Sequence, residues 1–231
     1  MRYLGGKARV AKQLTSFLES VRKEGQLYVE PFLGGCNILP LMNNPRIGSE
    51  INADLIAFYT ALRDGWIPPK HCSEYSYQRV KRLQSPCALK GFIGIACSFS
   101  GKWWGGYARG GKGRDYCTNG HNVAMRKKPL IQNVSFASVD YRCLEIPDNS
   151  LVYCDPPYKE TQGYNSGGFD SLEFWEWARE LSKRCDVYVS EYQAPEDFEC
   201  VWQIERNMEM QTKAGKPKRL ERLFKWKGDN S

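Results

Sequence analysis

The spacing of apolar and polar residues predicts alternating helices and strands in the first part of the chain. Apolar residues recur at helical intervals over residues 10–18. Short strands are predicted at residues 26–30 and 46–50, each followed by a helix, the first from about residue 37 and the second over residues 53–64. Strand–turn–helix units of this kind are typical of a Rossmann-like, nucleotide-binding sheet.

The same pattern resumes after residue 133 and continues nearly to the end of the chain. The later elements are predicted to be strands at residues 134–139, 151–155 and 186–190, a helix at 171–184, and a closing antiparallel pair at 198–204 and 220–226. Strands alternating with helices predict an α/β fold with a mainly parallel sheet.

The intervening segment has a different character. The sequence Gly-Trp-Ile-Pro-Pro at residues 65–69 breaks the strand–helix pattern. Beyond it, residues 77–84 form a basic amphipathic stretch, and helices are predicted at residues 88–99 and 122–128. We therefore expect one domain formed by residues 1–64 and 134–231, with residues 65–133 inserted as a second, mainly helical domain.

Charge separates the same two regions. The whole chain carries +7, but residues 66–135 hold twelve lysines and arginines against two acids, a net charge of +10. A second basic stretch, residues 213–227, carries +6, so the remainder is acidic at −9. This asymmetry favours nucleic-acid binding, with a solvated basic face as the alternative.

Composition excludes several other classes of protein. Apolar runs fall short of the roughly 18 residues that span a bilayer, and the N-terminus lacks the apolar core of a signal peptide. The nine cysteines form no C-x-x-C pair and their odd count argues against a closed disulfide framework. Two histidines without ligand spacing argue against a zinc site. We expect a reduced, cytoplasmic protein without membrane or metal partners.

Candidate chemistry is concentrated at residues 151–158, Leu-Val-Tyr-Cys-Asp-Pro-Pro-Tyr. Pro156 and Pro157 cannot continue a strand, so Asp155 is predicted at its carboxyl end. Ligands of open α/β sheets bind at that edge. The carboxylate of Asp155, the carbonyl of Pro156 and the ring of Tyr158 together suit a flat ring that bears an amino group.

A cofactor site is predicted after the first strand. Gly34 and Gly35 allow a ligand to approach the backbone, and the acid Glu50 ends the next strand, where it can accept hydrogen bonds from ribose hydroxyls. The alternative for Glu50 is an exposed acid at a strand end. The phosphate-binding sequences G-x-G-x-x-G and the P-loop are absent, which favours a cofactor without phosphate.

A glycine-rich stretch in the insertion interleaves aromatic and basic residues. Its candidate nucleic-acid contacts are Lys102, Trp103, Trp104, Tyr107, Arg109, Lys112 and Arg114, with Arg126 in the basic stretch that follows. Exposed aromatic rings can stack on bases, and cations can bind phosphates or guanine edges. In the alternative interpretation, Trp103 and Trp104 pack beneath the loop.

Four short sequences in this order, with a basic insertion before the last, resemble a known family. They are Tyr3-Leu4-Gly5-Gly6-Lys7, Glu30-Pro31-Phe32-Leu33-Gly34, Glu50-Ile51-Asn52-Ala53-Asp54 and Asp155-Pro156-Pro157-Tyr158. The chain resembles the Dam-type, α-class (D12) DNA adenine-N6 methyltransferases over nearly its whole length. The resemblance implies a Rossmann-like S-adenosylmethionine-dependent methyltransferase sheet with an inserted target-recognition domain. Cys36 stands where the family commonly has a second glycine.

The resemblance also assigns roles to residues. Those implied to bind S-adenosylmethionine, with S-adenosylhomocysteine as product, are Tyr3, Lys7, Glu30, Phe32, Gly34, Gly35, Glu50, Asp140 and Asp155. Those implied to be catalytic are Asp155, Pro156, Pro157 and Tyr158. The expected reaction is methylation of a flipped-out adenine in double-stranded DNA by a monomer in the cytoplasm of a bacterial or phage-infected cell. The alternatives are methylation of RNA adenine or of a protein glutamine, and a catalytically inactive DNA-binding relative.

Overall fold

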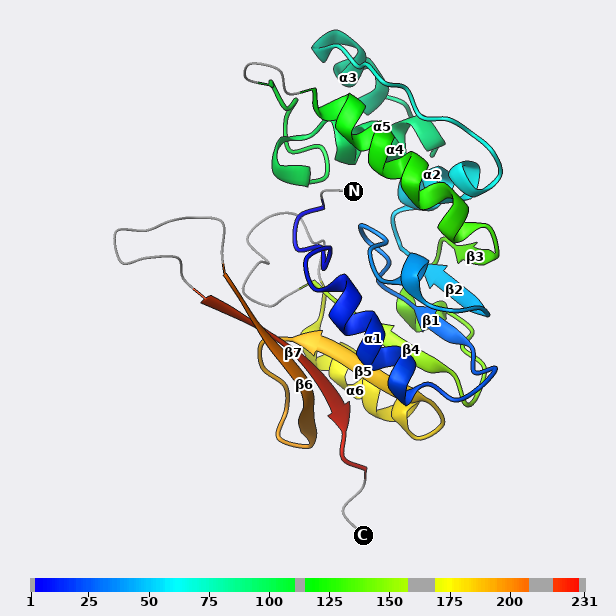
Figure 1. Cartoon of the computed structure of the whole chain (residues 1–231), viewed down its shortest axis with the longest axis vertical. Helices are drawn as coiled ribbons and strands as arrows, with labels where there is room; N and C mark the ends of the chain where they lie inside the picture. The colour runs from blue at the N-terminus through cyan, green and yellow to red at the C-terminus, as the bar shows by residue number, and fades with distance from the viewer. Residues whose placement is uncertain (1–2, 111–114, 158–168, 208–217, 229–231) are drawn as a thin grey trace. The chain divides into compact units, whose positions relative to one another are not determined.

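The computed structural model describes residues 3–110, 115–157, 169–207 and 218–228 of the chain (Figure 1). Two compact units divide it, Met1–Glu145 and Ile146–Ser231. Among the described residues, no helix combines the length and apolar character that crossing a bilayer requires.

The first unit contains three parallel strands, β1 (Tyr28–Glu30), β2 (Arg46–Ser49) and β3 (Val134–Ala137), in the order β3-β2-β1. Helix α1 (Ala11–Val21) precedes β1, and α2 (Ala53–Arg63) follows β2. Because the three strands are parallel, the residues that follow them lie at one edge of the sheet. That edge holds Phe32, the glycine turn and Glu50.

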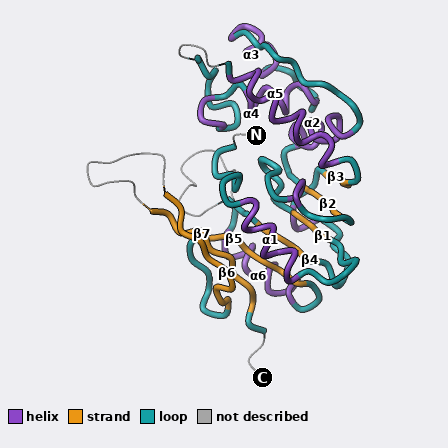
Figure 2. Tube along the Cα trace, in the orientation of Figure 1, coloured by secondary structure: helices purple, strands orange, loops and turns teal. Residues whose placement is uncertain are grey.

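Three helices lie between α2 and β3 along the chain: α3 (Glu74–Lys81), α4 (Ala88–Ala96) and α5 (Tyr116–Lys127) (Figures 1 and 2). Helix α4 packs very closely on α2, because a Cβ atom added at Gly91 would lie 2.0 Å from the carbonyl oxygen of Asp54. Helix α5 packs on α4 in the same way, with Gly120 against Ala96. The basic helical segment therefore belongs to the first unit and packs on its helix α2.

The second unit has parallel strands β4 (Leu151–Cys154) and β5 (Asp186–Glu191) with helix α6 (Ser171–Ser182) between them in the chain. Strand β7 (Lys218–Trp226) pairs antiparallel with both β5 and β6 (Phe198–Asn207). The predicted closing pair is confirmed, and both strands are longer than predicted.

The strand order is β3-β2-β1 in the first unit and β4-β5-β7-β6 in the second. Parallel strands that alternate with helices along the chain are typical of a Rossmann-like α/β fold, and β7 adds an antiparallel strand to the second unit. The predicted α/β fold class, with a helical segment inserted before β3, is confirmed.

Several predicted elements differ from those in the structure. The helix expected from about Asn37 is a single 3₁₀ turn, η1 (Leu39–Leu41), that contains Pro40. The sequence favours Ser171 as the cap of the helix that runs toward residue 184, but the cap of α6 is Asp170, whose side chain accepts hydrogen bonds from the N–H groups of Leu172 and Glu173. Short polar residues cap helices, and a sequence offers several adjacent candidates, so the first residue of a helix is harder to predict than its presence.

Candidate active site

The glycine turn, residues 33–36, leaves β1 at the carboxyl edge of the first unit. Gly34 has φ +42° and Cys36 has φ +49°, both in the left-handed region. The Cys36 N–H closes the turn on the Leu33 carbonyl at 2.7 Å, and the Leu33 N–H donates to the Ser49 carbonyl of β2 at 2.9 Å. Cys36 therefore adopts the conformation that a glycine would adopt most easily at its position.

Glu50 is tied directly to this turn. Its Oε2 accepts a hydrogen bond from the Gly34 N–H at 2.9 Å, and its Oε1 accepts one from the Asn52 N–H at 3.2 Å. Burial raises the pKa of the Glu50 carboxyl, although the backbone N–H groups that it accepts from act in the opposite direction. A carboxylate oxygen can accept two hydrogen bonds, so an acid held in this way keeps the capacity to accept from the two hydroxyls of a ribose.

Tyr3 explains why the turn has two glycines. A Cβ atom at Gly34 would lie 2.9 Å from the Tyr3 ring, and one at Gly35 would lie 2.7 Å from the Tyr3 Cβ. Side chains at residues 34 and 35 would therefore displace Tyr3. The sequence prediction was that these glycines make room for a ligand, whereas in the structure the space over them is filled by an aromatic residue that the resemblance assigns to the cofactor.

Two further predicted cofactor residues follow β1 and β3, the strands on either side of β2. The Phe32 ring packs on the Tyr141 ring with centroids 5.1 Å apart. Asp140 follows β3, but Arg142 binds both of its carboxylate oxygens, at 2.8 and 2.9 Å, which lowers the pKa of Asp140. Phe32 and Tyr141 thus present an aromatic pair, and Asp140 already has a cationic partner.

Lys7 and Glu30, also assigned to the cofactor by the resemblance, are buried. Oε2 of Glu30 accepts hydrogen bonds from the Leu39 N–H at 2.9 Å and from the Tyr28 hydroxyl at 3.1 Å. Glu30 therefore fixes the backbone after the glycine turn, a structural role that the sequence did not indicate.

The predicted catalytic sequence lies in the second unit. Asp155 directly follows the buried strand β4 and is half-buried, Pro156 is buried and Pro157 is exposed. Tyr158 lies outside the described residues. The two prolines end the strand where the sequence predicted, which leaves the Asp155 carboxylate at its carboxyl end.

The aromatic residues of the basic segment are mostly packed. The Trp103 ring covers Gly94 of α4, where an added Cβ atom would lie 2.5 Å from it. Trp104 and Tyr107 both pack against the buried ring of Tyr77, with centroids 4.8 and 5.6 Å apart. Trp103 and Trp104 thus pack on neighbouring residues of the segment, and both remain half-exposed.

The exposed aromatic residue of this loop is Phe99, with 67% of its surface accessible. Ser98 and Tyr107 form an isolated antiparallel bridge, and the Phe99 N–H donates to the Gly106 carbonyl at 2.8 Å. Ser100, beside Phe99, has φ +58°. Phe99 was not singled out from the sequence because its neighbours, two tryptophans, were the more conspicuous aromatics.

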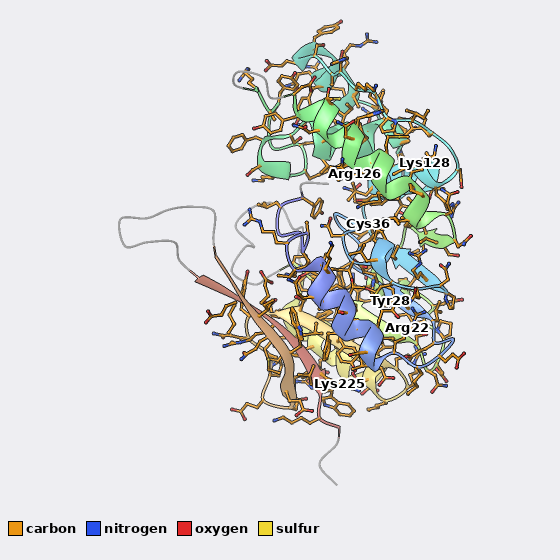
Figure 3. All side chains as sticks on the ribbon, viewed as in Figure 1. Arg22, Tyr28, Cys36, Arg126, Lys128 and Lys225 are labelled. Atoms are coloured by element: carbon orange, nitrogen blue, oxygen red, sulfur yellow. The ribbon has the colours of Figure 1, made fainter. Side chains whose placement is uncertain are left out.

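Among the predicted cations, Arg109 is exposed and pairs with Glu74 at 2.6 Å. Arg126 is exposed at the end of α5 (Figure 3), and Lys102 is half-buried. Lys112 and Arg114 lie outside the described residues. Of the basic residues predicted to contact nucleic acid, Arg109 and Arg126 therefore lie at the surface of the basic segment.

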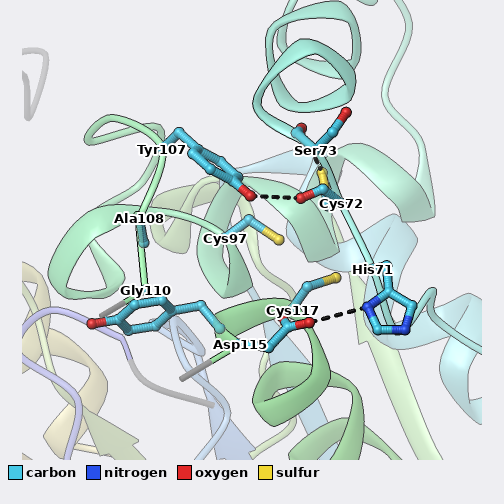
Figure 4. Close-up of a pocket in the computed structure, with 10 residues that line it drawn as sticks. His71, Cys72, Ser73, Cys97, Tyr107, Ala108, Gly110, Asp115 and Cys117 are labelled. Carbon is cyan, nitrogen blue, oxygen red and sulfur yellow. Dashed lines mark hydrogen bonds and ion pairs between the residues drawn. The ribbon is translucent and has the colours of Figure 1, made fainter. Parts of the chain in front are cut away.

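A separate cavity of about 260 Å³ lies within the basic segment (Figure 4). Three thiols line it, Cys72, Cys97 and Cys117, together with the hydrogen-bonded pair His71 and Asp115. A hydrogen bond with Cys97 lowers the pKa of Cys72. The described residues include no group of three or more His, Cys, Asp or Glu side chains arranged to hold a metal ion. These three cysteines are far apart in the sequence, and the fold brings them together at this cavity.

Comparison with known families supports the resemblance drawn from the sequence. Residues 3–85 match the family model described as D12 class N6 adenine-specific DNA methyltransferase. The match supports a methyltransferase with S-adenosylmethionine as cofactor, and it spans the glycine turn, Glu50 and the start of the basic segment. None of the curated proteins matches this sequence significantly.

Similar solved structures share little sequence with this chain. PH1948 from Pyrococcus horikoshii, provisionally described as an RNA methyltransferase, is 10% identical with a TM-score of 0.45 over 94% of this chain and 82% of its own. An rRNA methylase from Streptococcus thermophilus is 9% identical with a TM-score of 0.40 over 95% and 98%. SMU.472, provisionally described as a methyltransferase and complexed with SAH, is 10% identical with a TM-score of 0.37 over 100% and 56%.

Proposed function

We propose that this chain, whose residues 3–85 match the D12 class family model, transfers a methyl group from S-adenosylmethionine to the N6 amino group of adenine in double-stranded DNA. The observation that carries the proposal is the Glu50 carboxylate bonded to the Gly34 N–H at 2.9 Å, at a strand end beside Phe32. It supports a ribose-binding cofactor site, and Asp155 after β4 supplies the acceptor for an amino group.

The chemistry follows from the substrate. The lone pair of the adenine amino group is delocalised into the ring, so the nitrogen is a poor nucleophile. Asp155 and the carbonyl of Pro156 accept hydrogen bonds from the amino group. These hydrogen bonds draw electron density onto the nitrogen and offset the positive charge that develops there. Bound S-adenosylmethionine would supply the methyl group: the bond from nitrogen to the methyl carbon forms as the carbon–sulfur bond breaks, S-adenosylhomocysteine leaves, and the methylated nitrogen releases one proton to solvent. No metal is needed for this transfer.

The basic segment favours a nucleic acid over a protein glutamine. Residues 66–135 carry +10, and Arg109 and Arg126 lie at its surface. In a duplex the adenine amino group is paired and the stacked neighbours cover both faces of the ring, so the base must be flipped at a cost of a few kcal/mol. Phosphate contacts from this segment, and stacking by the exposed ring of Phe99, offset that cost.

Further parts of the proposal concern organisation and setting. We propose that residues 65–133 act as the target-recognition domain and residues 1–64 and 134–231 as the catalytic domain. The protein works as a monomer in the cytoplasm of a bacterial or phage-infected cell. An inactive DNA-binding relative has no need for the Asp-Pro-Pro-Tyr sequence, which is intact here.

A direct test compares acceptors. Wild-type protein with methyl-labelled S-adenosylmethionine is expected to label adenine N6 in mixed-sequence duplex DNA at least about tenfold faster than in RNA of the same sequence, a ratio equal to about 1.4 kcal/mol. Nucleoside digestion and mass spectrometry identify the product. Faster labelling of the RNA would replace the DNA proposal with the RNA alternative, and label on neither would exclude both.

The surface of the basic segment gives a second prediction. Arg109→Ala is expected to weaken duplex binding and to lower the slope of log K against log salt by about 0.9, the loss of one phosphate contact. Phe99→Ala is expected to weaken binding with little change in that slope, because a ring carries no charge. Fluorescence anisotropy at several salt concentrations measures both. Equal slopes for Arg109→Ala and wild type would remove Arg109 from the interface.

A further inference from the structure

Two buried side chains hold the carbonyl groups of the glycine turn. The Tyr59 hydroxyl donates to the Gly34 carbonyl at 2.8 Å. The Lys127 Nζ donates to the Gly35 carbonyl at 2.7 Å and also to the Cys36 carbonyl. The same Nζ lies 5.5 Å from the centroid of the Tyr59 ring. Three consecutive carbonyls of the turn are thus bound by one lysine and one tyrosine that contact each other.

Lys127 reaches the turn from the basic segment. It is the last residue of α5, and only 8% of its surface is accessible. Its neighbours in sequence behave differently: Arg126 is exposed, and Lys128 binds the exposed carbonyl of Gly65 at 2.7 Å (Figure 3). Burial lowers the pKa of Lys127, and a buried ammonium group is tolerated only where acceptors replace its water. The two turn carbonyls are those acceptors.

The turn needs such support because of its backbone. Cys36 has φ +49°, a conformation that costs a residue with a side chain about 1–2 kcal/mol. Strained residues persist where their surroundings determine the conformation. Cys36 is fully buried, and burial raises the pKa of its thiol to about 11, so it contributes a neutral side chain to the core beneath the turn. The cation of Lys127 beside its carbonyl stabilises this arrangement.

We propose that Lys127 and Tyr59 are positioning residues for the cofactor. By binding the carbonyls of Gly34, Gly35 and Cys36 they fix three consecutive peptide groups of the turn, directly after the peptide group whose Gly34 N–H donates to Glu50. The inference rests on the proposed function, because the turn matters only if S-adenosylmethionine binds there. It also makes the inserted segment part of the cofactor site, since the C-terminal residue of α5 supplies one of the two contacts.

The test measures binding of S-adenosylhomocysteine by calorimetry without nucleic acid, so that DNA contacts play no part. Lys127→Met is expected to raise the Kd about tenfold or more, and Tyr59→Phe about threefold, from the loss of buried hydrogen bonds. Lys128→Met is the matched control: it also removes a lysine–carbonyl hydrogen bond, but to Gly65, and its Kd is expected to stay within about twofold of wild type. Lys127→Arg is expected to recover part of the loss.

The outcomes separate the two proposals. If wild-type protein does not bind S-adenosylhomocysteine, the cofactor part of the proposed function fails. If it binds, and both Lys127→Met and Tyr59→Phe bind equally well, the positioning role fails. Near-UV circular dichroism shows whether each variant folds. If Lys127→Met does not fold, the Kd of Tyr59→Phe decides whether the positioning role holds. In turnover, positioning predicts a raised KM for S-adenosylmethionine with kcat near wild type at saturation, whereas a general loss of structure lowers kcat as well.

Discussion

Asp155→Ala is expected to lower kcat for methyl transfer by about 10²–10³-fold or more, the scale on which enzymes lose rate when one preorganised hydrogen-bonding partner of the transition state is removed. The loss falls on kcat because the amino group becomes positively charged only as the methyl group arrives. The adenine then needs an acceptor more strongly than it does in the ground state. Single-turnover transfer of labelled methyl groups to duplex DNA measures the effect on this step directly.

Asp148→Ala is the matched control for Asp155. Asp148 is an exposed carboxylate that precedes β4, at the opposite end of the same strand, and pairs with Arg184 at 2.7 Å. Its loss removes a surface ion pair, which typically contributes about 0–1 kcal/mol to stability, and is expected to leave kcat unchanged. A kcat for Asp155→Ala within about threefold of wild type would contradict the role assigned to Asp155, since preorganised partners contribute far more.

The position of Asp155 could be predicted from sequence because local rules determine it. A run of strand-forming residues, ended by two prolines that cannot join a ladder, leaves one place for the acid. The same holds for the start of the helix predicted over residues 53–64, where the side chain of Asn52 caps α2 by accepting a hydrogen bond from the Asp54 N–H. Neither prediction depends on what packs against these residues.

The contacts of Lys127 could not be predicted in the same way. Lys127 lies 92 positions after Gly35 and has lysine or arginine on either side. Only the packing of α5 on α4, and of α4 on α2, turns one of those three cations inward. The packing of Trp103 and Trp104 could not be predicted for a related reason, since composition shows that a loop contains aromatic residues but not which of them packs on a glycine of a neighbouring helix.

Glu50→Gln is expected to weaken S-adenosylhomocysteine binding about ten- to hundredfold, because hydrogen bonds to a charged acceptor contribute about 1.5–3 kcal/mol each. The glutamine side chain is similar in size to glutamate, but its hydrogen-bonding groups do not match the backbone groups around it. Both Glu50 oxygens accept from backbone N–H groups, of Gly34 and Asn52, and an amide must present its NH₂ to one of them. The glycine turn then loses its bond to β2 as well as the acceptor for ribose. Calorimetry at pH 8 measures the difference.

The pH dependence follows from the buried position of Glu50. Its pKa is raised in the folded protein, so the ionised form that accepts from ribose fills only as pH rises through that raised pKa. The Kd of wild type is therefore expected to fall with rising pH and then level off, while that of Glu50→Gln stays flat.

The free energy of unfolding is expected to change in the opposite sense to the affinity. A raised folded pKa means that the contribution of Glu50 to the free energy of unfolding is present at low pH and is lost as pH rises through the folded value. Over the pH interval in which wild type gains affinity for S-adenosylhomocysteine, its free energy of unfolding should thus fall relative to that of Glu50→Gln. If affinity and the free energy of unfolding instead rise or fall together, Glu50 does not bind the cofactor as an ionised acceptor.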